Sequence, residues 1–174
     1  DLTGYAPTRM EAIQGHTEMS WRALAQLITA LENETASGEV KGERSKPLMA
    51  LAHEIYAQAA IKKIPVLGIT GTGGAGKSSL TDELIRRLRL DQDDSLRVAV
   101  ISIDPSRRKS GGALLGDRIR MNAINPWGNG PRVFMRSLAT RDFGSEISAA
   151  LPDVIAACKV AGFDLIVVET SGIG

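Results

Sequence analysis

A glycine-rich stretch constrains this chain more than any other part of its sequence. Residues 71–78 read Gly-Thr-Gly-Gly-Ala-Gly-Lys-Ser, which fits the pattern G-x-x-x-x-G-K-[ST]. Glycines let the backbone turn tightly enough for successive N–H groups to point inward and bind phosphate oxygens. The lysine of such a loop reaches the β- and γ-phosphates, and the serine hydroxyl is a ligand of Mg²⁺. The stretch therefore predicts a nucleotide-binding loop between a strand and a helix.

Each residue of this loop has a predicted role. Lys77 supplies a positive charge and is predicted to act in catalysis, and Ser78 supplies an oxygen for the metal. The helix that follows directs the positive end of its dipole at the same anion. The residues predicted to bind the nucleotide are Gly71, Gly73, Gly74, Ala75, Gly76, Lys77, Ser78 and Ser79.

The residues on either side of the loop fit this arrangement. Residues 65–70 read Pro-Val-Leu-Gly-Ile-Thr, a short apolar run typical of a buried strand with a proline at its start. After the loop, leucines recur at a spacing of four with charged residues between them. This spacing predicts an amphipathic helix whose apolar face carries Leu80, Leu84 and Leu88.

The same glycines also satisfy a dinucleotide-binding pattern. Gly71-x-Gly73-x-x-Gly76 matches G-x-G-x-x-G, and Asp104 lies near the end of the next predicted strand. A dinucleotide site does not need Lys-Ser after the third glycine, and its acidic residue usually lies nearer to the loop. The sequence therefore favours the nucleotide-triphosphate loop.

Composition is that of an ordinary globular protein. With 174 residues, 43% of them hydrophobic, the chain can bury the core of one domain plus an extension. Its formal net charge of +1 predicts no general attraction to nucleic acid or to an anionic membrane. The single cysteine, Cys158, excludes an internal disulfide and a CxxC metal site. The sequence shows neither a signal peptide nor a membrane-spanning run, so we expect a cytoplasmic protein.

Two helices are predicted before the nucleotide-binding region. A polar segment with two glycines, residues 33–46, separates them, and Pro47 lies in the first turn of the second helix. We predict a helical linker or extension over residues 1–61, either packed on the next domain or serving as a docking arm. Residues 62–174 are predicted to form the N-terminal part of the nucleotide-binding domain. The predicted apolar faces consist of Leu24, Leu27, Ile28 and Leu31, and of Leu48, Leu51 and Ile55.

The remaining segments predict a parallel sheet. Residues 97–104 and 164–169 are apolar runs that each end in a carboxylate, and a short strand is expected at residues 132–135. Strands that alternate with helices imply an α/β fold with a mostly parallel sheet and helices on both faces. A helix that Pro152 kinks or delays is predicted before the last strand. Its predicted apolar face consists of Ile147, Leu151, Val154, Ile155 and Cys158.

Acidic residues at strand ends predict a metal site. Ligands of such sheets bind at the carboxyl ends of the strands, where the loop, Asp104 and Glu169 all fall. Mg²⁺ accompanies a nucleotide triphosphate, prefers oxygen ligands and keeps several waters. We therefore predict Ser78, Asp104 and Glu169 as ligands, directly or through water. Asp117 follows a glycine-rich basic segment, residues 106–116, that can reorganise around a γ-phosphate. For Asp117 a metal role and a helix cap or solvated charge both stay open.

Five segments together resemble one family of P-loop GTPases, the chaperones of adenosylcobalamin-dependent acyl-CoA mutases. The resemblance is strongest to the branch in which a cobalamin-binding domain, the GTPase and an isobutyryl-CoA-type mutase share one polypeptide. It covers residues 62–174, and residues 1–61 are similar to the helical linker between the cobalamin and GTPase domains. The matching segments are residues 71–78, 104–106, 110–121, 137–141 and 169–172.

The resemblance implies Mg²⁺-dependent GTP binding and hydrolysis that gates cofactor loading and protection of the mutase. Lys77, Asp104, Asp117 and Glu169 would be catalytic, and Ser78 with the three carboxylates would hold Mg²⁺ and form the nucleotide switch. GTP or GDP would bind here, whereas adenosylcobalamin would belong to the parent protein and not to this segment alone. The implied partners are the cobalamin-binding and mutase domains, in the same or a partner chain, in a homodimer.

One departure from the family pattern leaves alternatives open. The chain ends at Gly174, directly after Glu-Thr-Ser-Gly, and contains no [NT]-K-x-D guanine-reading motif. We interpret it as a segment of a longer protein, and guanine specificity follows from the resemblance alone. A small-molecule kinase similar to uridine kinases is one alternative, because residues 68–78 also suit that class. A metallochaperone or partition-type switch is another, although the chain has no His- or Cys-rich tract.

Overall fold

The computed structural model describes residues 6–36, 46–104, 130–140 and 147–170. The chain divides into two compact units that do not follow chain order. The helical unit comprises Asp1–Ile64 and Ala149–Phe163, and the sheet unit comprises Pro65–Ser148 and Asp164–Gly174. The sequence predicts a different kind of division, a linker over residues 1–61 followed by a nucleotide-binding domain. That division stays a prediction.

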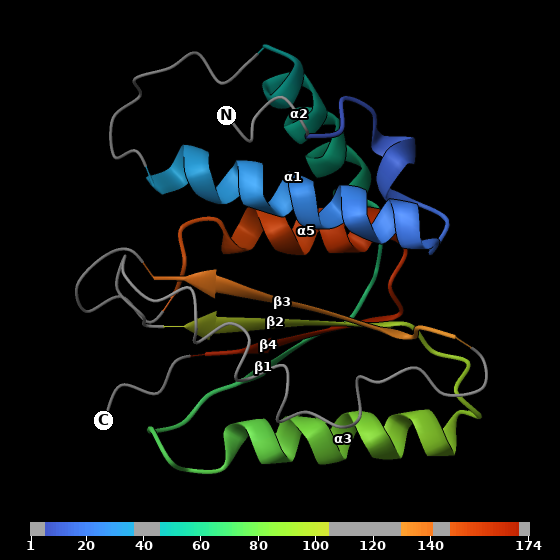
Figure 1. Ribbon diagram of the computed structural model, residues 1–174, viewed down its shortest axis with the longest axis vertical. Coiled ribbons are helices and arrows are strands. Elements are labelled where there is room, and N and C mark those ends of the chain that lie inside the picture. Colours follow the sequence, from blue (N-terminus) through green and yellow to red (C-terminus); the bar gives the residue numbers. More distant parts are fainter. Residues whose placement is uncertain (1–5, 37–45, 105–129, 141–146, 171–174) are drawn as a thin grey trace. The chain divides into compact units, whose positions relative to one another are not determined.

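Among the described residues, the sheet unit is built on four parallel strands. They are β1 (Val66–Ile69), β2 (Val98–Asp104), β3 (Val133–Ala139) and β4 (Leu165–Glu169), in the spatial order β1-β4-β2-β3. Because all pairs are parallel, the carboxyl ends of the strands lie at one edge of the sheet, where the chain also turns into helix α3 (Lys77–Asp91) (Figure 1). The α/β fold and the strands expected near residues 97–104 and 164–169 are confirmed, and the expected short strand extends to Ala139.

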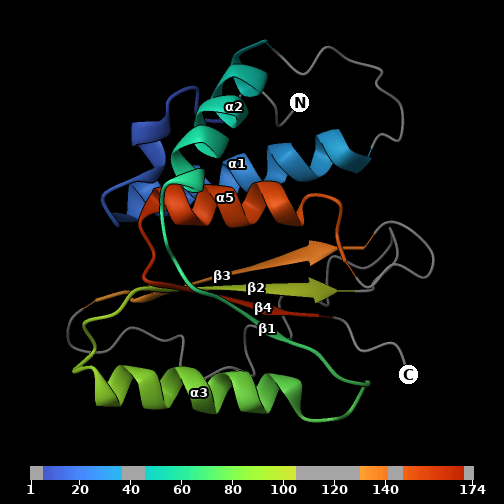
Figure 2. The same ribbon diagram turned by 180° about the vertical axis from the view of Figure 1, so that it is seen from behind.

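Helix α3 packs on one face of this sheet (Figure 2). Ile85 of α3 forms a buried cluster with alternate residues of three strands, among them Val100 and Val167. Since side chains alternate between the two faces of a strand, residues two positions further on point to the same face. Ser102 and Glu169 therefore share the face that α3 covers. The full cluster consists of Ile85, Val98, Val100, Val133, Met135 and Val167.

The buried side of α3 differs from the predicted one. The sequence predicts an apolar face of Leu80, Leu84 and Leu88, but Leu80 is 59% exposed and the other two are half-buried. The buried residues are instead Thr81, Ile85 and Arg89, one position further along the helix. Two of these three are polar, and each bonds to a carboxylate: Thr81 to Glu169, and Arg89 to Asp94. The prediction was wrong because these polar partners, one 88 and one five residues away, outweigh the leucine spacing.

The first strand is also less buried than predicted. Residues 66–69 do form β1, but Val66 and Leu67 are 42% and 41% exposed. The reason is position, since β1 lies at the edge of the described sheet and pairs there with β4 alone. The prediction of a strand is confirmed, and the prediction of burial is wrong.

The described part of the helical unit contains a short 3₁₀ helix and three α-helices. They are η2 (Met10–Ile13), α1 (Glu18–Ala36), α2 (Lys46–Ala60) and α5 (Leu151–Ala161). The apolar faces predicted for α1 and α2 are confirmed, because all seven of their residues are buried. Among the described residues no helix is long and apolar enough to cross a membrane.

Helix α5 begins later than its predicted apolar face. Pro152 lies in the first turn, where a missing N–H leaves no helical bond unmade, so the proline delays the helix as predicted. Ile147 precedes the helix and is 56% exposed, which corrects its predicted place in the core. Cys158 is fully buried, and burial raises the pKa of its thiol to about 12. A neutral, buried thiol is the small core residue that the sequence predicts.

An aromatic cluster joins the two sequence segments that make up the helical unit. His16 contacts Trp21 and Phe163 edge-on, with ring centroids 6.3 and 5.2 Å away. Trp21 Nε1 donates to His16 Nδ1 at 3.3 Å, and His16 Nε2 lies 3.0 Å from the carbonyl oxygen of Gly162. Because Nδ1 accepts, Nε2 carries the proton and donates to Gly162, so both contacts require a neutral imidazole.

We expect Asp94→Asn to destabilise the protein through Arg89. Arg89 donates from Nε to Asp94 Oδ1 at 2.6 Å and from Nη2 to Asp94 Oδ2 at 3.0 Å. The two side chains are 1% and 8% exposed. Asparagine keeps the shape and tolerates the positive φ of 53° at this position, but it removes the charge. Leaving a buried guanidinium without its counter-ion should cost about 3 kcal/mol in urea unfolding. Arg86→Gln, which breaks an exposed pair on the same helix, should change little, and equal losses in both variants would contradict this account.

A second stability prediction concerns Gly162, which ends α5 with a φ of +94°. A methyl group here would lie 3.2 Å from His16 Nε2 and adopt a backbone region that L-residues disfavour. Gly162→Ala should therefore cost more than the ~1–2 kcal/mol of left-handed strain alone. Gly15→Ala is the control, because Gly15 has a similar φ of +90° with open space around it. Urea unfolding of both variants would contradict the steric account if their losses were equal.

Candidate functional site

The glycine-rich loop adopts a conformation that depends on its glycines. Gly74 and Gly76 have φ values of +77° and +82°, which side-chain-bearing residues rarely adopt. Gly76 is also the N-cap residue directly before α3, and no side chain caps the helix there. The first N–H groups of α3 are therefore not bonded to a capping side chain, and the positive end of the helix dipole lies at the loop.

Lys77 is held by its own loop. Its Nζ donates to the carbonyl oxygens of Gly71 at 2.8 Å and Thr72 at 2.9 Å. The ammonium group thus lies against the inner side of the turn, where the sequence predicts that phosphate binds. The structure thus places Lys77 against its own loop, and its contact with phosphate stays a prediction.

Glu169 connects the end of β4 to the start of α3. Ser78 Oγ donates to Glu169 Oε1 at 2.7 Å, and Thr81 Oγ1 lies 3.0 Å from Oε2. The carboxylate belongs to a residue that is only 7% exposed. Two residues predicted as metal ligands, Ser78 and Glu169, are therefore in direct contact. Sequence reasoning did not select Thr81, because a threonine inside a helix gives no local sign of a partner 88 residues away.

Asp104 lies near this contact at the end of β2. Ser102 pairs in register with Glu169, and Asp104 is two residues further along the same face. With about 3.3 Å per residue along a strand and 4.8 Å between strands, the two acidic Cα positions are about 8 Å apart. The backbone oxygen of Asp104 accepts from Thr140 N at 3.0 Å, which joins the ends of β2 and β3. The strand-end carboxylates thus share one edge and one face.

The register also places part of residues 137–141, one of the segments that resemble the family. Ser137 of β3 pairs with Ser102 of β2, which in turn pairs with Glu169 of β4. Two hydroxyls, of Ser137 and Ser102, and the carboxylate of Glu169 therefore lie side by side on three neighbouring strands. Asp117 and the basic glycine-rich segment around residues 106–116 lie outside the described residues.

The residues present fit a hard divalent cation. A hydroxyl and one or two carboxylates are the oxygen donors that Mg²⁺ takes from a protein when nucleotide phosphates and water supply the other ligands. Within the described ranges, no group of three or more His, Cys, Asp or Glu side chains is arranged to hold a metal by itself. The hydroxyl and carboxylate donors suit a metal that arrives with a nucleotide, whose phosphates supply further oxygen ligands.

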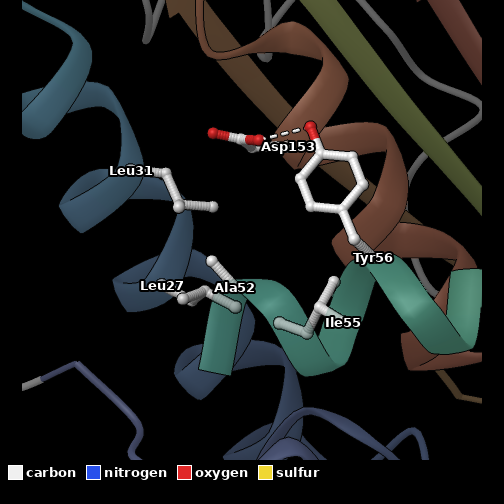
Figure 3. Close-up of a pocket in the computed structure, with 6 residues that line it drawn as sticks. All are labelled: Leu27, Leu31, Ala52, Ile55, Tyr56 and Asp153. Atoms are coloured by element: carbon white, nitrogen blue, oxygen red, sulfur yellow. Dashed lines mark hydrogen bonds between the residues drawn. The ribbon is translucent and has the colours of Figure 1, made fainter. Parts of the chain in front are cut away.

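A small pocket in the helical unit has a different character (Figure 3). It has an empty volume of about 210 Å³ and lies among α1, α2 and α5. Tyr56 donates to Asp153 Oδ1 at 2.5 Å across it, so its two polar side chains are bonded to each other. The other lining residues are apolar: Leu27, Leu31, Ala52 and Ile55. This lining contains no group suited to phosphate, and we assign the pocket no role in nucleotide binding.

A parallel α/β sheet with a glycine-rich loop, Lys77 and Ser78 at the start of a helix, and an acidic residue at an adjacent strand end defines a P-loop nucleotide-binding protein. The sequence model of the family described as "Methylmalonyl Co-A mutase-associated GTPase MeaB" matches residues 24–174. The chain belongs to this GTPase family. The family resemblance stated from the sequence is thereby confirmed.

Individual relatives agree with the family. The chain is 67% identical over all 174 residues to a protein of Cupriavidus metallidurans named fused isobutyryl-CoA mutase, and covers 14% of that protein. It is 50% identical over the same length to a protein of that name from Nocardia farcinica, again covering 14%. A crystal structure titled LAO/AO transport system kinase superposes with a TM-score of 0.57 at 26% identity, over 99% of this chain and 44% of that one. The chain thus spans about one seventh of the curated relatives named here.

Family membership decides among the alternatives left open by the sequence. It favours a GTPase over the dinucleotide-binding protein, the small-molecule kinase and the metallochaperone. It also supports guanine nucleotide as the ligand class, although the guanine-reading motif is not in these residues.

We expect Lys77→Ala to weaken nucleotide binding while the fold is kept. A charge-assisted contact with phosphate is worth about 1.5–3 kcal/mol, so the dissociation constant for GDP should rise about 10- to 150-fold. Lys63→Ala, at an exposed lysine before β1, is the matched control and should bind like the parent. Calorimetric titration of the full-length protein measures both. Unchanged affinity in Lys77→Ala would remove the lysine from the site.

Proposed function

We propose that this chain is the nucleotide-binding part of a Mg²⁺-dependent GTPase that gates adenosylcobalamin loading and protection of an acyl-CoA mutase. The proposal places the GTPase in one polypeptide with a mutase of the isobutyryl-CoA type. The observation that supports it is the contact of Ser78 with Glu169, which joins the glycine-rich loop to an acidic strand end.

Each residue has a defined part in the proposed reaction. The loop N–H groups and Lys77 would bind the phosphates and offset the negative charge that develops during transfer. Ser78, with Asp104 and Glu169, would hold Mg²⁺ directly or through water, and Asp117 would join them. The metal would polarise the transferring phosphoryl group and orient the nucleotide. Glu169 would keep Ser78 oriented, because its Oε1 accepts the serine proton at 2.7 Å and leaves the hydroxyl lone pairs for the metal.

The proposed partners follow from the relatives. Two proteins that match the whole chain are named fused isobutyryl-CoA mutase and are about seven times longer than this segment. This supports a mutase and a cobalamin-binding domain as the partners of the GTPase. Adenosylcobalamin would bind to those parts and not to this segment alone. The homodimer and the cytoplasmic location that the sequence analysis expects stay predictions.

Glu169→Gln and Asp104→Asn test the proposed reaction. Both variants keep side-chain shape but remove a charge that would act through the metal, so GTP hydrolysis should fall about 100-fold. Metal-free GDP binding should stay close to the parental value. Asp91→Asn, at an exposed position at the end of α3, is the control. The assay measures phosphate released by the full-length protein, with and without added nucleoside acceptors. Parental rates in both variants would remove the carboxylates from the site, and transfer to an acceptor would favour a kinase.

A further inference from the structure

Thr81 is a polar side chain at the centre of the packed face of α3. It is 0% exposed and lies four residues after Lys77 in the helix. Its Oγ1 is 2.9 Å from the carbonyl oxygen of Lys77 and 3.0 Å from Glu169 Oε2. A threonine in this position needs only the first contact to satisfy its hydroxyl within the helix. The second contact is therefore additional and requires its own explanation.

The hydroxyl of Thr81 has one proton for these two acceptors. It can donate to Glu169, or it can donate to the Lys77 carbonyl, but it cannot make two full hydrogen bonds at once. The carboxylate is the stronger acceptor because a bond to a charged group is stronger than one between neutral groups. The Lys77 carbonyl is a second acceptor within reach, so the hydroxyl stays satisfied if the carboxylate turns.

Glu169 depends on this hydroxyl for its orientation. Among the described residues, the two groups bonded to its carboxylate are the neutral hydroxyls of Ser78 and Thr81, one on each oxygen. The terminal torsion of a glutamate is broad and has no staggered minimum to fix it. With Oε2 held by Thr81, Oε1 faces Ser78. Without Thr81, the carboxylate plane would rotate about its single remaining bond.

We propose that Thr81 is a positioning residue of the nucleotide site, which holds the Glu169 carboxylate in the plane that serves Ser78. This inference rests on the proposed function, since it assigns to Thr81 a part in the metal-dependent step. It separates two properties of the site. Phosphate binding by the loop and Lys77 does not involve Glu169, whereas the response to Mg²⁺ passes through Ser78 and Glu169.

The test compares Thr81→Val, which keeps the shape and removes the hydroxyl, with Thr81→Ser, which keeps the hydroxyl. In the full-length protein, Thr81→Val should raise the Mg²⁺ concentration that half-saturates GTP hydrolysis about tenfold, the equivalent of 1.4 kcal/mol. Mg²⁺ should also tighten nucleotide binding less in this variant than in the parent. GDP affinity in EDTA should stay within about twofold of the parent. Thr81→Ser should resemble the parent in all three measurements.

Thr29→Val is the matched control for a purely structural role. Thr29 Oγ1 donates to the carbonyl oxygen of Ala25, four residues earlier in α1, at 3.0 Å. Its replacement removes the same kind of helical bond far from the carboxylate in sequence and leaves the Mg²⁺ response unchanged. If Thr81→Val lowers the unfolding temperature and keeps the parental Mg²⁺ response, Thr81 is structural and the proposal is overturned.

Two further outcomes keep the proposals separate. If Thr81→Val does not fold, Thr81→Ala removes the same hydroxyl with less volume and carries the same expectations. If the parent protein itself shows no Mg²⁺-dependent nucleotide binding or hydrolysis, the proposed function fails. In that case the assignment of Thr81 to the site fails with it, and the parent measurement alone reveals this.

Discussion

The buried carboxylate of Glu169 is the interaction on which the arrangement of the sheet unit depends. A carboxylate that is removed from water is costly unless its oxygens are bonded, and both oxygens here accept from hydroxyls of α3. The same side of the helix continues with Ile85 in the apolar cluster and ends with Arg89 paired to Asp94. Successive turns of α3 are therefore fixed by a hydroxyl–carboxylate contact, by apolar packing and by an ion pair. Polar contacts therefore hold both ends of the helix, and the hydroxyl–carboxylate contact lies at the end that carries the glycine-rich loop.

Much of this architecture could be predicted from local sequence. The loop pattern of residues 71–78 specifies its own backbone, because Gly74 and Gly76 take positive φ values that few other residues adopt. The apolar runs that become β2 and β4 are long enough to identify as strands, and each ends in the predicted carboxylate. The apolar spacing of α1 and α2 identifies their buried residues. These features share one property: the signal and the structure it specifies lie within a few residues.

The two wrong predictions, on the buried side of α3 and on the burial of β1, depend on contacts that apolar spacing does not reveal. The buried side of α3 is set by Glu169, which lies 88 residues from Thr81. It is also set by the ion pair of Arg89 with Asp94, which are only five residues apart, but apolar spacing does not identify a buried ion pair. Leu80, Leu84 and Leu88 lie one residue, or about 100° of helix rotation, from the side that is buried. The exposure of β1 likewise follows from strand order, which no apolar run reveals. Sequence periodicity finds apolar contacts, whereas at this site polar partners decide which way the helix faces.

The same contacts suggest an order of events when nucleotide binds. Lys77 donates to carbonyls of a loop that is largely exposed, so water can replace the ammonium group when phosphate draws it away, and the exchange costs little. Water cannot replace the donors of Glu169 in the same way, because this residue is only 7% exposed. A lost hydrogen bond would therefore leave a buried carboxylate oxygen unsatisfied. The lysine can therefore move readily while the carboxylate must keep at least one donor. Thr81, at 3.0 Å from Oε2, is one such donor, and Ser78 on Oε1 is the other. The contacts of Lys77 with the loop carbonyls can thus be exchanged at little cost, whereas the hydrogen bonds of Glu169 at the strand end are costly to lose.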